Sequence, residues 1–192
     1  SVLAAANQQV KKLGVVVLFN ERLFSARYVQ KVHASNVDGF ASAGYGYLGT
    51  VDQDVVNIYQ KPLVRESYEV TDDLPLVDII PFHLGADDRF IKTSISTGAK
   101  GIVLEGSGRG HVTAEMAQAI AEATEKGIIV VLTTRSREGE VRYAYDFEGS
   151  VYDLTNKGVL IGNDYDSKKA RLKLAVLLAT GAKKKEVEMA FL

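Results

Sequence analysis

The sequence has no cysteine, no long apolar run and almost no net charge. The absence of cysteine excludes disulfide bonds and cysteine-ligated metals, although it does not fix the compartment. No stretch approaches the roughly 20 apolar residues that a membrane-spanning helix needs. No signal-peptide pattern is found, so we expect a cytoplasmic protein with no membrane partner. With a formal net charge of −1, the chain has no excess of positive charge that would favour binding to nucleic acid. The basic run at residues 183–185 is expected to be the solvated start of a helix.

The composition is that of an ordinary globular protein. The chain has 192 residues, 46% hydrophobic and 24% charged, enough for one domain or for one domain plus a remnant of another. It opens on Ser1, directly inside a helical pattern. We therefore expect that the chain was processed or cut from a larger protein.

The first third of the chain is predicted to be the end of a domain. Apolar residues at helical spacing from Val2 to Leu13 predict one helix, and Gly14 is a suitable stop. Residues 15–19 then form a continuous apolar run, typical of a strand covered on both faces. Residues 22–61 look irregular apart from a strand near their end. A helix that leads into such a strand is half of an α/β repeat. Alone it has too few neighbouring elements to bury the strand, which suggests a missing front domain.

The remainder is regular. We predict a domain end over residues 1–64, a polar linker over 65–75 and a complete domain over 76–192. In the last of these, Asp87 and Asp166 are predicted helix caps, and Phe90 is predicted to face the core. The apolar strands expected there are at residues 77–82, 102–104, 128–132 and 159–161. Strands that alternate with helices through short loops predict an α/β fold, a doubly wound parallel sheet of flavodoxin-like type.

Ligands approach an open parallel sheet at the carboxyl ends of its strands. This places the candidate site at His83 and Gly85, at residues 105–111 and at residues 133–137. Residues 106–111 (GSGRGH) partly imitate a dinucleotide fingerprint, but His111 stands where the third glycine belongs, and no acidic residue ends the next strand. A flexible turn, a small-ligand loop and a nucleotide loop all remain open.

The other candidate residues give weaker signals. The three histidines share no ligand spacing, so we expect no metal site. His111 lies near a helix N-terminus, where a neutral hydrogen-bonding role or a plain surface position would each fit. Arg135 and Arg137 could clamp an anion or simply lie on the surface. The hydroxyls considered as nucleophiles, none with a His–Asp arrangement, are those of Ser25, Ser35, Thr133 and Thr134.

Four segments, in order, resemble the bacterial-type L-asparaginases. Residues 26–31 (ARYVQK) are similar to the family's Ser/Gly-Arg-Asp-Val-Thr-Lys, and residues 37–49 resemble its Val-Asp-Ala-Phe … Gly-Pro-Leu-Gly. Residues 98–104 (GAKGIVL) with the glycine loop resemble Gly-Ala-Lys-Gly-Ile-Val … Gly-x-Gly. Residues 168–171 stand where the family has the end of Asn-Pro-Gln-Lys-Ala-Arg. Together these segments cover essentially the whole chain.

The resemblance implies a function for two positions. In the family a front-domain threonine attacks the side-chain amide of asparagine, and a second threonine, an aspartate and the lysine matching Lys31 handle the protons. The residue matching His111, often asparagine in the family, helps to hold the substrate in a site shared between subunits, so Gly110 and His111 are expected to bind substrate. An acid in the loop after the third strand is also shared, but the sequence does not say which. The resemblance further implies a homo-oligomer, no cofactor, and a chain that is inactive alone because the threonine nucleophile and the Thr-Asp pair are missing.

Two other functions remain open. One is a flavodoxin-like module that binds a small anion or nucleotide through the glycine loop. The other is the asparaginase-like subunit of a tRNA-dependent amidotransferase, for which a nucleic-acid partner is expected and the neutral charge is unfavourable.

Overall fold

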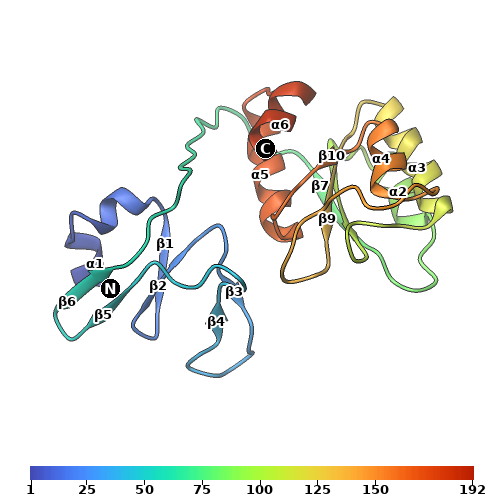
Figure 1. Cartoon of the computed structure of the whole chain (residues 1–192). Helices are drawn as coiled ribbons and strands as arrows, with labels where there is room; N and C mark the ends of the chain where they lie inside the picture. Colours follow the sequence, from blue (N-terminus) through green and yellow to red (C-terminus); the bar gives the residue numbers. More distant parts are fainter. The chain divides into compact units, whose positions relative to one another are not determined.

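A computed structural model describes all 192 residues of the chain. They form two compact units, Ser1–Ser67 and Tyr68–Leu192, each with its own apolar core (Figure 1).

The first unit opens on two short helical segments. The α-helix α1 (Val2–Ala6) is followed by the 3₁₀-helix η1 (Val10–Leu13). Between them Asn7 is extended, and its side-chain oxygen accepts hydrogen bonds from the amides of residues 9 and 10, at 2.8 and 3.3 Å. The prediction of one continuous helix is therefore wrong, because this asparagine side chain replaces helical backbone hydrogen bonds.

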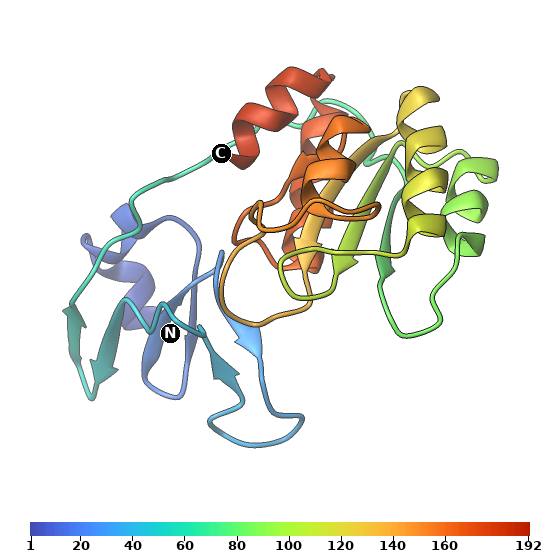
Figure 2. The same ribbon diagram turned by 45° about the vertical axis from the view of Figure 1, so that its right-hand side comes forward.

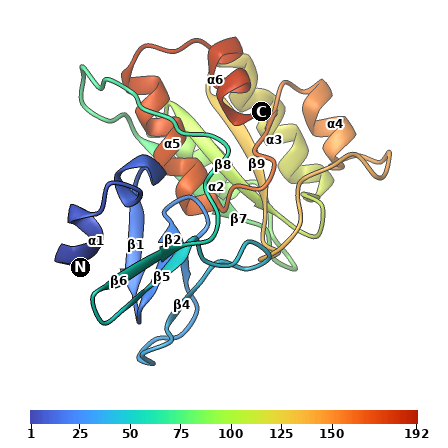
Figure 3. The ribbon, with the colours of Figure 1, turned by 60° about the vertical axis from the view of Figure 1, so that its left-hand side comes forward.

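The main sheet of this unit is antiparallel and has the order β1-β2-β5-β6 (Figure 3). The first two strands form a hairpin in which Asn20 and Glu21 have φ values of 45° and 60°, as a two-residue primed turn requires. The strand predicted near the end of residues 22–61 is present, but the rest of that segment, predicted to be irregular, contains further strands. The predicted strand at residues 15–19 is only partly buried and is not covered on both faces. The strands are β1 (Val16–Phe19), β2 (Arg22–Ser25), β5 (Gly49–Asp52) and β6 (Val55–Ile58), with a separate pair β3 (Gln30–Lys31) and β4 (Phe40–Ala41).

The second unit contains a parallel sheet of four strands in the order β10-β9-β8-β7. The predicted α/β class with a parallel sheet is confirmed. The strands are β7 (Val77–Pro81), β8 (Gly101–Gly106), β9 (Ile129–Thr134) and β10 (Leu160–Ile161).

Helices cover both faces of this sheet (Figures 1 and 2). Because successive side chains of a strand point to opposite faces, Ile102 and Leu104 pack in one core while Val103 packs in the other. This explains the continuous apolar runs of β8 and β9. The first core includes residues of α2 (Arg89–Ser96), α3 (Ala114–Glu125) and α4 (Val151–Asn156), and the second includes residues of α5 (Ser167–Ala179) and α6 (Lys184–Phe191).

The predicted caps have mixed outcomes. Asp166 caps α5 as expected, with its side chain accepting from the amides of Lys168 and Lys169. The N-cap residue of α2 is Asp88 and not the predicted Asp87. The carboxylate of Asp87 accepts hydrogen bonds from both the amide and the guanidinium of Arg89.

One further expectation about the helices is wrong, and one helix was not expected. Phe90 is 58% exposed and is not a core residue, because it lies about 100° around the helix from the buried Ile91. Helix α4 was not predicted from the sequence, since its six residues are too few to show a clear period.

Candidate functional site

The glycine loop after β8 closes on itself. Ser107 and His111 exchange two backbone hydrogen bonds of 2.9 Å, and the amide of Gly110 also donates to the Ser107 carbonyl. A side chain at Gly106 would collide with the backbone of Gly110, so the close approach requires glycine. Three of the loop's N–H groups are thus used internally, which argues against a dinucleotide loop that cradles phosphate.

The imidazole of His111 lies against two aromatic rings. Its centroid is 5.5 Å from that of Tyr145 and 5.1 Å from that of Phe147. Both ring nitrogens are buried and have no hydrogen-bond partner. Burial lowers the pKa of His111 from its ordinary value of 6.5, so the neutral imidazole is favoured. The neutral ring therefore has one donor and one acceptor, neither of them paired, and a ligand can reach them only when the covering residues move aside.

The segment of residues 135–149, here named the cover loop, carries both aromatic residues. It is anchored near its middle by Val141, which is 1% exposed and donates its amide to the carbonyl of Asn163 at 3.2 Å. At its end Gly149 accepts from the amide of Val112 at 3.0 Å. Tyr145 and Phe147 were not predicted from the sequence as site residues. The aromatic residues at every second position from 143 to 147 were the available signal.

The N-terminus of α3 lies just after the glycine loop. The helix begins at Ala114, and the Thr113 side chain caps it by accepting from the amide of Met116 at 3.1 Å. The Val112 amide is already bound to Gly149. Neither of these two N–H groups is free for a substrate carboxylate, whereas both ring nitrogens of His111 are buried and unpaired.

The polar residues at the end of β9 and just after it serve the fold. The hydroxyl of Thr133 is fully buried and donates to the Leu104 carbonyl at 2.9 Å. The hydroxyl of Thr134 donates to the Gly108 carbonyl and so joins the two loops. The Arg135 guanidinium donates to the Phe82 carbonyl at 2.6 Å, while Arg137 is exposed, so the two arginines do not form a clamp.

Lys31 lies in the first unit, on the short strand β3. Its ammonium group is 4.8 Å from the ring centroid of Phe40 on the paired strand β4, a cation–π contact. The side chain is exposed and makes no ion pair. Within its own unit Lys31 is therefore held by an aromatic ring and keeps its ammonium hydrogens available.

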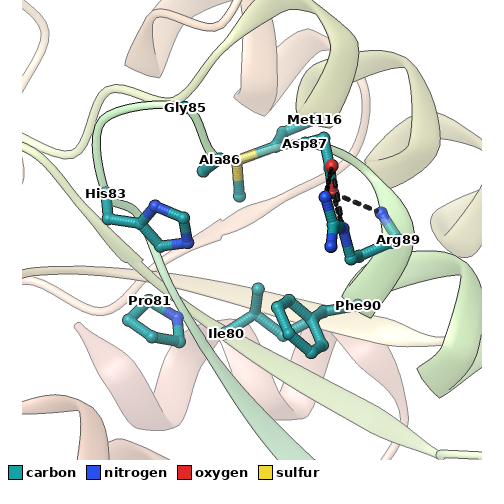
Figure 4. A pocket seen from close by; sticks show the side chains of 9 residues that line it. All are labelled: Ile80, Pro81, His83, Gly85, Ala86, Asp87, Arg89, Phe90 and Met116. Carbon is teal, nitrogen blue, oxygen red and sulfur yellow. Dashed lines mark hydrogen bonds and ion pairs between the residues drawn. The ribbon is translucent and has the colours of Figure 1, made fainter.

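A small cavity of about 100 Å³ lies beside the end of β7 (Figure 4). It brings together His83 and Gly85, as expected, with the ion pair of Asp87 and Arg89, in which the guanidinium Nε lies 2.8 Å from both carboxylate oxygens. This hydrogen bonding lowers the pKa of Asp87 to about 2. The cavity is smaller than the roughly 300 Å³ of ordinary ligand sites. The charges of Asp87 and Arg89 already neutralise each other. Its lining residues are Ile80, Pro81, His83, Gly85, Ala86, Asp87, Arg89, Phe90 and Met116.

Comparisons with protein families match this arrangement of two units. Residues 1–64 match the model of the asparaginase N-terminal domain, and residues 76–191 match that of the glutaminase/asparaginase C-terminal domain. The fold and the sequence thus define an α/β protein that matches the two asparaginase domains in order. The chain belongs to the bacterial-type L-asparaginase family.

Individual relatives support the same conclusion. The chain is 52% identical to an L-asparaginase of Bacillus licheniformis over 94% of its length and 56% of the relative's. It is 32% identical to L-asparaginase 2 of Bacillus subtilis over 93% of its length and 47% of the relative's. It is 27% identical to a probable periplasmic L-asparaginase of Haemophilus influenzae over 100% of its length and 55% of the relative's. The chain therefore spans about half the length of these curated relatives. None of its helices is long and apolar enough to cross a membrane.

Proposed function

We propose that this chain is the later part of an L-asparaginase, which hydrolyses L-asparagine to L-aspartate and ammonia through a threonine acyl-enzyme. The observation that carries the proposal is the collinear match of both units to a relative named L-asparaginase, at 52% identity over 94% of the chain. The two site residues, Lys31 and His111, lie one in each unit. The cytoplasmic location stays a prediction, and one relative is named as periplasmic.

In this proposal Lys31 is the catalytic lysine. A threonine hydroxyl is a weak nucleophile until a nearby group removes its proton or stabilises the alkoxide that forms. An ammonium group can do the second and can also take part in a proton relay. The exposed Lys31, without an ion pair of its own, is available for both roles.

His111, with Gly110, is the part of the substrate site that the second unit contributes to a neighbouring subunit of a homo-oligomer. A neutral imidazole can donate one hydrogen bond to the carboxylate of asparagine without bringing a charge into the site. The two unpaired ring nitrogens of His111 support this role, because unpaired buried polar groups are uncommon. The loop glycines allow a substrate to approach the backbone closely.

The 192-residue chain alone is proposed to be inactive. The Thr133 and Thr134 hydroxyls, at the end of the third parallel strand, both donate to backbone carbonyls and are unsuited to nucleophilic attack. An ammonia-release assay with asparagine and the purified chain tests this, with the Bacillus licheniformis relative as the positive control. No release above background is expected. Sustained release by the chain alone would contradict the proposal and would show that it holds its own nucleophile.

A further inference from the structure

The last turn of α6 is anchored by two polar side chains from other parts of the second unit. The Lys173 ammonium of α5 donates to the Ala190 carbonyl at 2.5 Å, and the Asn163 amide donates to the Phe191 carbonyl at 2.6 Å. These are the carbonyls that the end of a helix leaves without an internal partner. The end of α6 is therefore bound to specific groups instead of fraying.

Asn163 also has a second contact, on the side of the cover loop. Its own carbonyl accepts the amide of Val141 at 3.2 Å. The backbone of Asn163 has a φ of 49°, a left-handed conformation that asparagine tolerates better than most residues but that still needs support. The hydrogen bond from its side chain to Phe191 supplies that support.

Val141 in turn packs against the glycine loop. A side-chain carbon built on Gly110 would lie 3.2 Å from a Val141 methyl group and 3.0 Å from one of Leu132. The next residue after Gly110 is His111. A continuous set of contacts therefore runs from Phe191 through Asn163 and Val141 to Gly110 and His111.

We propose that Asn163 is a positioning residue that couples the end of α6 to the cover loop, so that the C-terminal helix fixes the surroundings of His111. Loss of the bond to Phe191 frees the Asn163 backbone, loosens Val141 and lets Tyr145 and Phe147 move away from the imidazole. The relevance of this coupling to hydrolysis rests on the proposed function of His111. The coupling itself is a property of the second unit and needs no substrate.

The test is the titration of His111 in the full chain, followed by NMR, with the ring signals assigned through a His111→Gln variant. Asn163→Gly removes the side-chain amide and keeps the left-handed backbone. Its His111 pKa is expected to move up toward 6.5, because burial is what lowers it. The Val141 amide is expected to exchange with solvent roughly tenfold faster, as for the loss of about one hydrogen bond.

Two further variants make the result decisive. Asn163→Asp keeps the size and the tolerance for left-handed backbone but cannot donate to Phe191, so it should give the same changes even if Asn163→Gly does not fold. Ser94→Ala removes a partly buried hydrogen bond of 2.6 Å to Asp78, on the α2 side, and should leave the His111 pKa and the Val141 exchange unchanged. A folded Asn163 variant with the native His111 titration, or an equal shift in Ser94→Ala, would overturn the coupling. Because no substrate is used, that failure is distinct from a failure of the proposed asparaginase function.

Discussion

The ammonium group of Lys173 lies 2.5 Å from the Ala190 carbonyl oxygen and 2.8 Å from the Tyr165 hydroxyl, in a side chain that is only 8% exposed. A positive charge at this point also stabilises the C-terminal end of α6, where the helix dipole is negative. The rings of Tyr165 and Phe191, centred 4.7 and 5.2 Å from the ammonium, add cation–π contacts. The buried Lys173 ammonium thus contacts a backbone carbonyl, a hydroxyl and two aromatic rings.

Replacing Lys173 by methionine should lower the free energy of unfolding by about 2–3 kcal/mol, because the Ala190 carbonyl would lose its bond to a charged donor. Urea denaturation of the full chain measures the change. Lys168→Met, at an exposed position of the same helix, is the matched control and should change stability by less than about 0.5 kcal/mol. Equal or higher stability of Lys173→Met would show that the desolvation of the charge outweighs its contacts.

The stability of the second unit should depend on pH through His111. Burial lowers its pKa in the folded state, so as pH falls below 6.5 the unfolded chain binds a proton that the folded chain does not. The free energy of unfolding should therefore fall as pH drops through 6.5 toward the lower folded pKa. His111→Gln should flatten this slope, whereas His83→Gln, at an exposed position, should keep it. Equal slopes in the wild type and His111→Gln would contradict the buried position of the ring.

Asp87 should stay ionised well into the acidic range. Its pKa of about 2 comes mainly from its hydrogen bonds to Arg89, so Arg89→Gln should raise it toward 3.8. Because the folded pKa is lowered, the stabilisation from this pair is present above about pH 3.8 and is lost as pH falls toward about 2. Carbon-13 NMR of the side-chain carboxyl measures the shift. An Asp87 pKa that Arg89→Gln leaves unchanged would show that the pair is not formed in solution.

Two glycines of the same loop should differ in their tolerance of alanine. At Gly106 the added methyl group would collide with the backbone of Gly110, which cannot move without opening the loop, so a loss of about 2–3 kcal/mol is expected. At Gly108 the space is open and only the positive φ of 53° opposes alanine, at a cost of about 1 kcal/mol. Thermal and urea unfolding of both variants give the comparison. Equal losses would mean that the loop is less tightly closed than the structure shows.

The parallel sheet could be predicted from the sequence because several signals agree there. Apolar runs of strand length, glycines at helix ends and the Asp166 cap all favour the same α/β arrangement. The first unit was harder to predict. Its hairpin turn at Asn20 and Glu21 has no glycine to mark it, and the Asn7 side chain interrupts an otherwise helical pattern.

The site was predictable only as far as local sequence determines it. The glycine loop and its place after a strand are local features, and they pointed to His111. The rings that cover His111 come from a loop more than 30 residues later in the chain. Asn163 acts through tertiary hydrogen bonds, which the hydrophobic pattern of the sequence does not indicate. Lys31 was found by resemblance, since an exposed lysine on a two-residue strand has no distinctive local pattern.

The most direct test of the proposed function is the turnover of asparagine by a fusion protein. In it, the part of the Bacillus licheniformis relative that lies outside the match precedes Ser1 of this chain. The fusion should release ammonia from asparagine, and Lys31→Met should lower its kcat by at least roughly 100-fold, the contribution of a positioned proton-transfer group. Lys61→Met, at another exposed lysine of the first unit, should leave kcat unchanged. A fusion that hydrolyses asparagine equally well with and without Lys31 would contradict the catalytic role assigned to this chain.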